Sequence, residues 1–263
     1  MDKGRKNTGR RGRLVILTIV LLSLASWGCA TDQQVREERA RALEELGISY
    51  VQKGELRSGL KHLLEAERLD PEDAEIKHEI ALVYRGLRLY DLSIEYFKKA
   101  LALRPRYSEA YNNLGTVYIL TRQWDKALAC FKRASSDVLY RTPHFAYRNM
   151  GLVYYNKGEF DKAIESYQQA ISLAPQFSPT YLNLGYAYEA VHRYQDAVEA
   201  YKKAIQYAST NVAALYRLGK LLYRLNRPQE ALEVFERFLD VAPDIPEKRE
   251  VRGLVAELKY RTK

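Results

Sequence analysis

Residues 111–134, YNNLGTVYILTRQWDKALACFKRA, decide the fold. In the first half of this stretch, aromatic, apolar and small residues recur at i, i+3, i+4 and i+7, on one face of a helix: Tyr111, Leu114, Gly115 and Tyr118. The second half places small and aromatic residues at i, i+4 and i+7: Ala127, Phe131 and Ala134. Small residues let two helices approach closely, and an aromatic ring fills the remaining volume. We therefore predict two closely packed helices joined by a turn.

The same pattern returns along the chain at nearly constant intervals. The small residue of the first helix recurs at spacings of 34, 34, 36, 34 and 34: Gly47, Ala81, Gly115, Gly151, Gly185 and Gly219. Sixteen residues after each of these comes an aromatic residue or leucine: Leu63, Phe97, Phe131, Tyr167, Tyr201 and Phe235. Proline, which cannot continue a helix, closes four units: Pro71, Pro105, Pro175 and Pro243. The pattern resembles the tetratricopeptide repeat (TPR), a helix-turn-helix unit of about 34 residues.

The resemblance implies an all-α fold, a right-handed superhelical solenoid of six repeats with a C-terminal capping helix. The expected repeats cover 40–245: 40–73, 74–107, 108–143, 144–177, 178–211 and 212–245. The long interval comes from two extra residues at the junction 135–143, and insertions in solenoids form loops on one face. Residues 246–263 are predicted to form an amphipathic helix that covers the last repeat, because a solenoid end otherwise exposes apolar surface.

The first residues of the chain predict an export signal. A basic stretch precedes an apolar run, residues 14–25, which as a helix would span about 18 Å, less than the roughly 30 Å bilayer core. Gly28 and Cys29 follow, and the segment resembles a bacterial lipoprotein signal, in which the cysteine after the cleavage site is acylated. The resemblance implies a signal peptide at 1–28 and a lipidated N-terminus and short linker at 29–39. An uncleaved signal anchor is the alternative.

The same resemblance implies a location. Ala30, rather than aspartate, follows the cysteine, which favours sorting to the outer membrane. The protein would then be anchored there by lipid on Cys29, and the repeats would face the periplasm.

The net charge of +9 does not point to a nucleic-acid partner. Residues 1–13 carry six basic residues and one acidic residue, so the remainder has +9 − 5 = +4, a weakly basic balance. The four histidines lack metal-ligand spacing, and the chain has no phosphate-binding glycine loop or nucleophile elbow. We therefore predict no catalytic residue, no metal, no cofactor and no small-molecule substrate, and expect a protein-binding function.

Residues that the repeat pattern does not need nominate a binding groove. On the far side of the first helices, the last three repeats carry tyrosines and bases, which are enriched in binding hot spots: Arg148, Tyr155, Tyr186, Tyr216, Lys220, Tyr223 and Arg224. The equivalent positions of the first repeats are more acidic or aliphatic, as at Glu44 and Glu75. A solvated groove with scattered tyrosines is the alternative.

Three asparagines, each two residues before its glycine, add a second feature of the groove: Asn113, Asn149 and Asn183. They resemble the amide ladder with which some TPR arrays hold an extended peptide, because an amide both donates and accepts hydrogen bonds. Local hydrogen bonds between helices are the alternative.

The whole chain resembles the type IV pilus pilotin (pilus biogenesis and stability) lipoproteins. The resemblance is carried by LGISYVQKGELRSGLKHLLEAERLDPEDAEIKHEIALVYRGL at 46–87, by SSDVLYRTPHFAYRNMGLVYYNKGEF at 135–160 and by APQFSPTYLNLGYAY at 174–188. It implies that the protein escorts the pilus secretin to the outer membrane or promotes its multimerisation. A periplasm-facing scaffold for another envelope complex is the alternative function.

Overall fold

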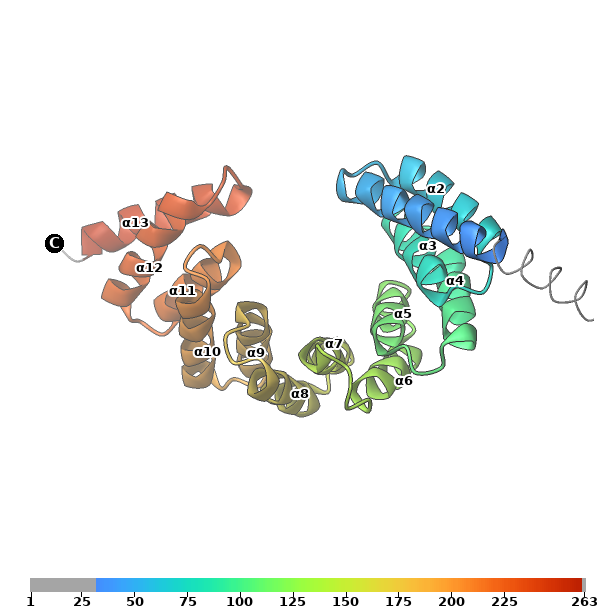
Figure 1. Cartoon of the computed structure of the whole chain (residues 1–263). Helices are drawn as coiled ribbons and strands as arrows, with labels where there is room; N and C mark the ends of the chain where they lie inside the picture. Colours follow the sequence, from blue (N-terminus) through green and yellow to red (C-terminus); the bar gives the residue numbers. More distant parts are fainter. Residues whose placement is uncertain (1–31, 262–263) are drawn as a thin grey trace, which may run out of the picture. The chain divides into compact units, whose positions relative to one another are not determined.

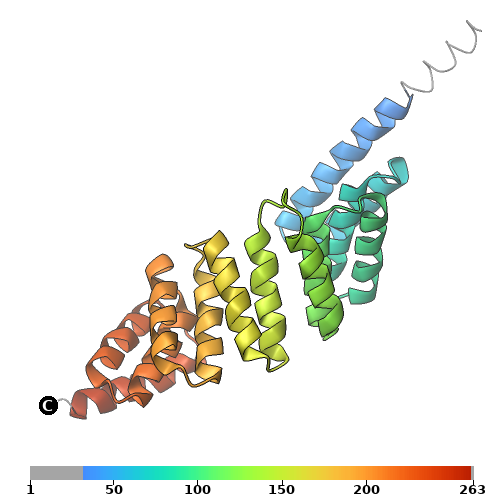
Figure 2. The same cartoon turned by 90° about the horizontal axis from the view of Figure 1, so that it is seen from below.

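The structure is a computed structural model that describes residues 32–261. Within that range the chain is helical and has no strand, so the predicted all-α array of helix pairs is confirmed (Figures 1 and 2). After a helical segment at 32–52, the helices are α2 (Leu56–Leu69), α3 (Ala74–Gly86), α4 (Tyr90–Leu103), α5 (Ser108–Leu120), α6 (Trp124–Ser135), α7 (Pro143–Asn156), α8 (Phe160–Leu173), α9 (Ser178–Ala190), α10 (Tyr194–Tyr207), α11 (Val212–Arg224), α12 (Pro228–Val241) and α13 (Pro246–Arg261). The chain divides into two compact units, which meet in the sequence between Pro105 and Arg106.

The first unit extends further toward the N-terminus than the sequence predicts. Residues 32–39, which we assign to a linker from the sequence, are helical and continue without a break into the first repeat helix. This stretch contains no glycine or proline and is rich in glutamate and arginine, which are good helix formers. The side chain of Ala40 is 1% exposed, so packing against the repeat begins at the end of this stretch.

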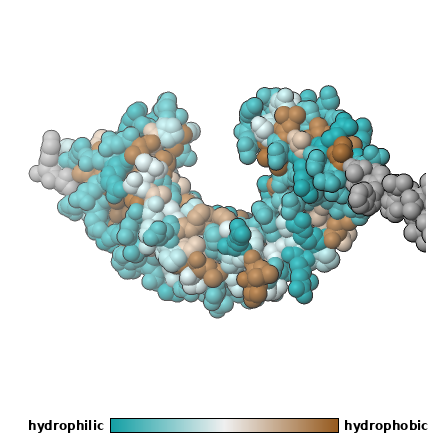
Figure 3. Space-filling view, in the orientation of Figure 1, coloured by the Kyte–Doolittle hydropathy of each residue, from teal (hydrophilic) through white to brown (hydrophobic). Residues whose placement is uncertain are grey.

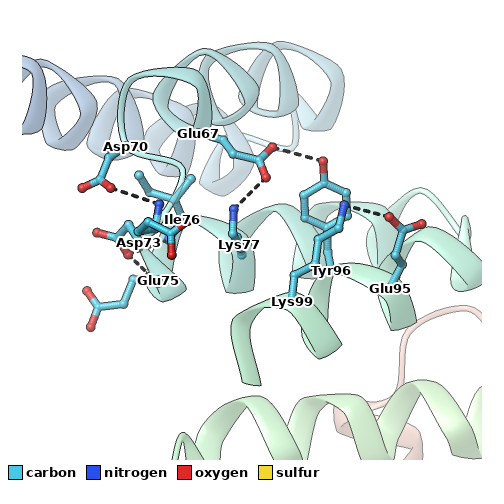
Figure 4. A network of polar contacts seen from close by, with 10 residues as sticks. Glu67, Asp70, Asp73, Glu75, Ile76, Lys77, Glu95, Tyr96 and Lys99 are labelled. Carbon is cyan, nitrogen blue, oxygen red and sulfur yellow. Dashed lines mark hydrogen bonds and ion pairs between the residues drawn. The ribbon is translucent and has the colours of Figure 1, made fainter. Parts of the chain in front are cut away.

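A polar network joins the helices of the first unit (Figure 4). Glu67 of α2 accepts hydrogen bonds from Lys77 Nζ of α3 at 2.9 Å and from Tyr96 Oη of α4 at 3.1 Å. Burial raises the pKa of Tyr96, and the Glu67 carboxylate raises it further. The phenol therefore stays protonated and serves as a donor to Glu67.

The second unit contains four helix pairs followed by α13. One core cluster of buried side chains runs from α8 to α13, and its largest fully buried side chains include Tyr167, Tyr201, Phe235 and Phe238. Glycines lie against the rings of Tyr167, Tyr201 and Phe235: a Cβ on Gly151 would lie 2.5 Å from Cε1 of Tyr167. Figure 1 shows α7 and α9 on the inner side of this unit and α8 on its outer side. Figure 3 shows a mostly hydrophilic surface with separate hydrophobic patches.

The turn inside each helix pair has the same backbone geometry. One residue per turn has a positive φ, between 56° and 82°, at matching repeat positions: Gly54, Arg88, Arg122, Gly158, His192 and Asn226. Non-glycine residues adopt this conformation at a cost of about 1–2 kcal/mol. Helix packing on both sides of the turn therefore imposes the geometry even where the sequence carries no glycine.

Candidate protein-binding groove

The inner helices of the second unit carry the groove residues that the sequence nominates. Arg148 and Tyr155 lie on α7, and Tyr186 lies on α9; all three are half-buried. Tyr155 meets Phe160 edge to face, with ring centroids 5.4 Å apart. Tyr155 and Tyr186 pack against the core and are partly exposed, so each presents part of its surface to solvent.

Arg148 is a cation without a carboxylate partner among the described residues. Its Nη2 donates to Oδ1 of Asn149 at 3.2 Å. The guanidinium carbon lies 5.9 Å from the ring centroid of Phe145 and 5.6 Å from that of Phe177. Burial lowers the pKa of Arg148, and burial followed by the Arg148 charge lowers the pKa of His144. The site is therefore locally positive and is held in shape by aromatic rings.

Asn149 has a structural role rather than an open one. Its side chain is 4% exposed, and Nδ2 donates to Oδ1 of Asn112 at 3.2 Å, which links α7 to α5. At this position of the ladder predicted from Asn113, Asn149 and Asn183, the structure has the alternative arrangement, a local hydrogen bond between two helices. Asn113 and Asn183 are half-buried. Asn112, which the sequence analysis did not single out, is the partner that decides this role.

Three of the four predicted groove residues of the sixth repeat are hydrogen-bonded to α13. Glu250 accepts hydrogen bonds from Tyr216 Oη at 2.8 Å and from Lys220 Nζ. Tyr223 Oη donates to Glu257 at 2.9 Å. Burial, together with the Glu250 carboxylate, raises the pKa of Tyr216 to about 12. The last helix therefore does more than cover apolar surface, since it takes up polar groups that the sequence assigns to a partner.

A second carboxylate organises the α9 end of the groove. Glu189 accepts from Tyr201 Oη at 2.6 Å and from Nη2 of Arg224 at 3.1 Å. Arg217, which the sequence analysis missed, lies over the ring of Tyr186 at 4.9 Å. Arg217 lies two residues before Gly219, at the position where repeats three to five have asparagine, so the asparagine pattern did not reveal it.

Beside this cluster lies an apolar pocket of about 370 Å³. Tyr186, Tyr216, Arg217 and Phe238 contribute to its walls, together with Val212, Ala213, Ile245 and Glu247. The pocket joins two predicted groove tyrosines to the start of α13, so α9 and α11 present a cavity with aromatic walls and a charged edge.

Four family models, all described as tetratricopeptide repeat, match residues 72–136, 144–177, 166–199 and 189–258. The chain belongs to the tetratricopeptide repeat family. The TPR array has helix pairs in which small residues admit an aromatic ring, as the contact of Gly151 with Tyr167 illustrates.

Among curated proteins, the TPR chain is 29% identical over 130 residues to the type IV pilus assembly protein PilF of Pseudomonas aeruginosa. The match covers 46% of this chain and 52% of PilF, so the chain spans about half the length of that relative. The protein is thus a TPR scaffold related to a type IV pilus assembly protein.

Two solved structures of pilus proteins have the same fold. PilW, a widely conserved type IV pilus biogenesis factor, has a TM-score of 0.74 and 23% identity, over 81% of this chain and 97% of PilW. The structure of Pseudomonas aeruginosa PilF has a TM-score of 0.72 and 23% identity, over 83% of this chain and 98% of PilF. At this identity, these structures support the fold of the TPR array.

Within residues 32–261 of the TPR chain, no helix is long and apolar enough to cross a membrane. In the same range, no three or more His, Cys, Asp or Glu side chains gather in a way that could hold a metal ion. The predicted signal peptide at 1–28 and the predicted lipid site at Cys29 lie outside the described residues.

Proposed function

We propose that this TPR protein binds a segment of the pilus secretin through the inner face of its second unit. In this way it assists localisation or assembly of the secretin in the outer membrane. The protein acts by binding and not as an enzyme. Its relation to PilF and PilW supports the pilus context. The observation that carries the binding proposal is Arg148, a half-buried cation that forms no ion pair with the described residues.

Arg148 selects the chemistry of the bound segment. A cation taken partly out of water without a counter-charge is unfavourable, and a carboxylate restores the balance. Guanidinium has five N–H donors in a planar fork that suits carboxylate, and the structure shows one side-chain bond, to Asn149. The rings of Phe145 and Phe177 leave an apolar border beside the charge. We expect the segment to carry an acidic side chain next to an apolar one.

The position of the array in the cell follows from the proposed anchor. Lipid on Cys29 would hold the protein on the outer membrane with the repeats in the periplasm. Two acyl chains give stable anchoring, whereas a single chain gives only reversible binding. The groove and the anchor therefore have separate tasks: the groove holds the secretin segment, and the anchor sets the destination.

The binding proposal is tested by replacing Arg148 with alanine. Hydrogen bonds to charged groups contribute about 1.5–3 kcal/mol, so Arg148→Ala should weaken binding of the purified protein to the secretin roughly 10- to 100-fold. Arg237→Ala, which removes an exposed arginine on α12, is the matched control and should leave binding unchanged. Equal affinity of both variants would remove Arg148 from the interface.

Crosslinking tests two points: whether the partner binds in the groove, and whether that partner is the secretin. A photo-crosslinking residue at position 155 or 186 should capture the secretin, while one at position 223, where Tyr223 is engaged by Glu257, should capture it less. Loss of the protein should also abolish secretin multimers in the outer membrane. Normal multimers after deletion, with crosslinks to a different envelope protein, would favour the alternative function as a scaffold for another envelope complex.

A further inference from the structure

The junction between α6 and α7 presents an unusual apolar tip. Val138 is 96% exposed and Leu139 is 84% exposed, more than any other large aliphatic side chain in the described part of the chain. Both lie in the junction 135–143, which adds two residues to the repeat period. Two neighbouring aliphatic side chains with this exposure bury little apolar surface within this chain and are available for a contact outside it.

The tip is held in place by defined hydrogen bonds. Ser108 Oγ donates to Oδ2 of Asp137 at 2.6 Å, and the backbone N–H of Leu139 donates to Oδ1 at 3.0 Å. The N–H of Tyr140 donates to the carbonyl of Asp137 at 3.1 Å. These bonds to Ser108 and Leu139 lower the pKa of Asp137. Asp137 thus connects the tip to α5 and directs its two aliphatic side chains away from the repeat.

Exposed basic residues lie on both sides of the tip in the sequence. Lys132 and Arg133 lie in the last turn of α6, Arg141 follows the tip, and Arg106 lies just before α5. None of them forms an ion pair with a described residue. The guanidinium carbon of Arg133 lies 6.0 Å from the ring centroid of Tyr111. Arg106 lies close enough to Asp137 to lower the pKa of that carboxyl. Glu109 lies near Tyr140, so the charge balance around the tip remains positive.

We propose that the α6–α7 junction is a membrane-contact site, in which Val138 and Leu139 insert into the head-group region of an anionic phospholipid surface. Two aliphatic side chains with a basic border match such a surface: the side chains enter the apolar boundary and the cations meet the lipid phosphates. This contact goes beyond secretin binding and does not use the groove. The affinity of the tip for lipid is low by itself. The contact forms readily in a protein that is already held at a membrane, because tethering raises the local lipid concentration.

Fluorescence at the tip provides a direct test. The full chain, with an environment-sensitive fluorescent amino acid at position 138, is mixed with vesicles of phosphatidylcholine and phosphatidylglycerol, or of phosphatidylcholine alone. We expect a blue shift and quenching by brominated acyl chains on the anionic vesicles. The same probe at Leu173, a 49% exposed aliphatic position at the end of α8, serves as the control and should not respond.

Charge variants test the basic residues beside the tip, with the fluorescence of the probe at position 138 as the readout. Arg133→Ser with Arg141→Ser should lower the partition constant onto anionic vesicles roughly 25-fold, since each base near an anionic surface contributes about a factor of five. Lys203→Ser with Arg237→Ser removes the same charge from exposed positions outside the junction and should have no effect. Circular dichroism confirms that each variant is folded.

Three results would overturn the proposal. In the first, the chain co-sediments with anionic vesicles but the emission of the probe at position 138 does not shift. In the second, the probe at position 173 shows the same blue shift as the probe at position 138. The third is a response at position 138 that requires added outer-membrane protein rather than lipid, which would assign the tip to a protein partner. The Arg148 experiments are independent of all three, so failure of the tip leaves the groove proposal separately testable.

Discussion

At the scale of single residues, the close contact between a glycine and an aromatic ring sets the spacing of the four helix pairs of the second unit. A Cβ on Gly151 would lie 2.5 Å from Cε1 of Tyr167, and that ring is 1% exposed and cannot move aside. Gly151→Ala should therefore lower the free energy of unfolding by roughly 2 kcal/mol, a typical cost of overpacking, measured by urea denaturation.

The matched control for this prediction is Gly253→Ala on α13. A Cβ on Gly253 has no neighbour within 4 Å, and alanine is the better helix former by about 1 kcal/mol. This variant should be slightly more stable than the parent. Similar effects of the two alanines would show that helix propensity, and not the ring contact, dominates at Gly151.

Glu44 links the stability of the first unit to pH. Burial, followed by the charges of Asp73, Glu75, Glu79 and Glu45, raises its pKa from 4.5 to about 7. The folded state thus holds this proton more tightly than the unfolded state, so stability is lost as pH rises from about 4.5 through 7.

Glu44→Gln should remove the loss of stability that accompanies rising pH. At pH 8 we expect a gain of roughly 1 kcal/mol, because solvent screening reduces the effect at a half-buried site, and the gain should vanish near pH 4.5. Urea denaturation across this pH range measures it. Glu65→Gln, an exposed site on α2, is the control. A pH-independent difference would show that the glutamine acts through something other than this proton.

At the scale of elements, α13 behaves as the neighbour that the sixth repeat requires. Val251, Val255 and Leu258 pack into the core, while Glu250 and Glu257 bond to tyrosines of α11. The amphipathic pattern of 246–263 predicts the apolar side of this contact. It does not reveal the polar side, because the bonded residues are 34 apart and depend on how α13 is placed against α11.

Glu250→Ala should loosen α13. The variant loses a carboxylate bonded to Tyr216 and Lys220, and for such a largely exposed group we expect a loss of roughly 1 kcal/mol. Amide hydrogen exchange in α13 should then be about fivefold faster. Glu233→Ala on α12 removes an exposed carboxylate without this contact and should leave the exchange of α13 unchanged. Unchanged exchange in both variants would limit α13 to apolar packing.

At the scale of the whole molecule, the proposed anchor and the repeat array have separable roles. Cys29→Ala should leave the melting temperature and helical content unchanged, because Cys29 precedes the repeat helices. It should release the protein from the outer-membrane fraction, measured by fractionation of the envelope. Retention of the variant in that fraction would favour the uncleaved signal anchor, whose apolar run lies at 14–25.

The local patterns in the chain are sufficient to determine the helix pairs. Helical periodicity and the 34-residue interval are properties of neighbouring residues, so they predict the all-α TPR array and the junction at 135–143. The helix at 32–39 was not predicted, because a charged stretch outside the repeat motif resembles a linker, although its residues are good helix formers.

Which polar side chains remain open to a partner was decided only by tertiary structure. Asn149 and Arg148 are adjacent in the sequence, yet Asn149 is buried against Asn112 on α5, whereas Arg148 lies half-buried beside aromatic rings without a carboxylate. Tyr216 and Tyr155 occupy similar faces of their helices, yet only Tyr216 meets a glutamate of α13. The sequence determines which side chains share a helix face, because that depends on spacing alone. Pairing between helices depends on how those helices pack, and residues 34 or 37 positions apart become neighbours only in the folded array.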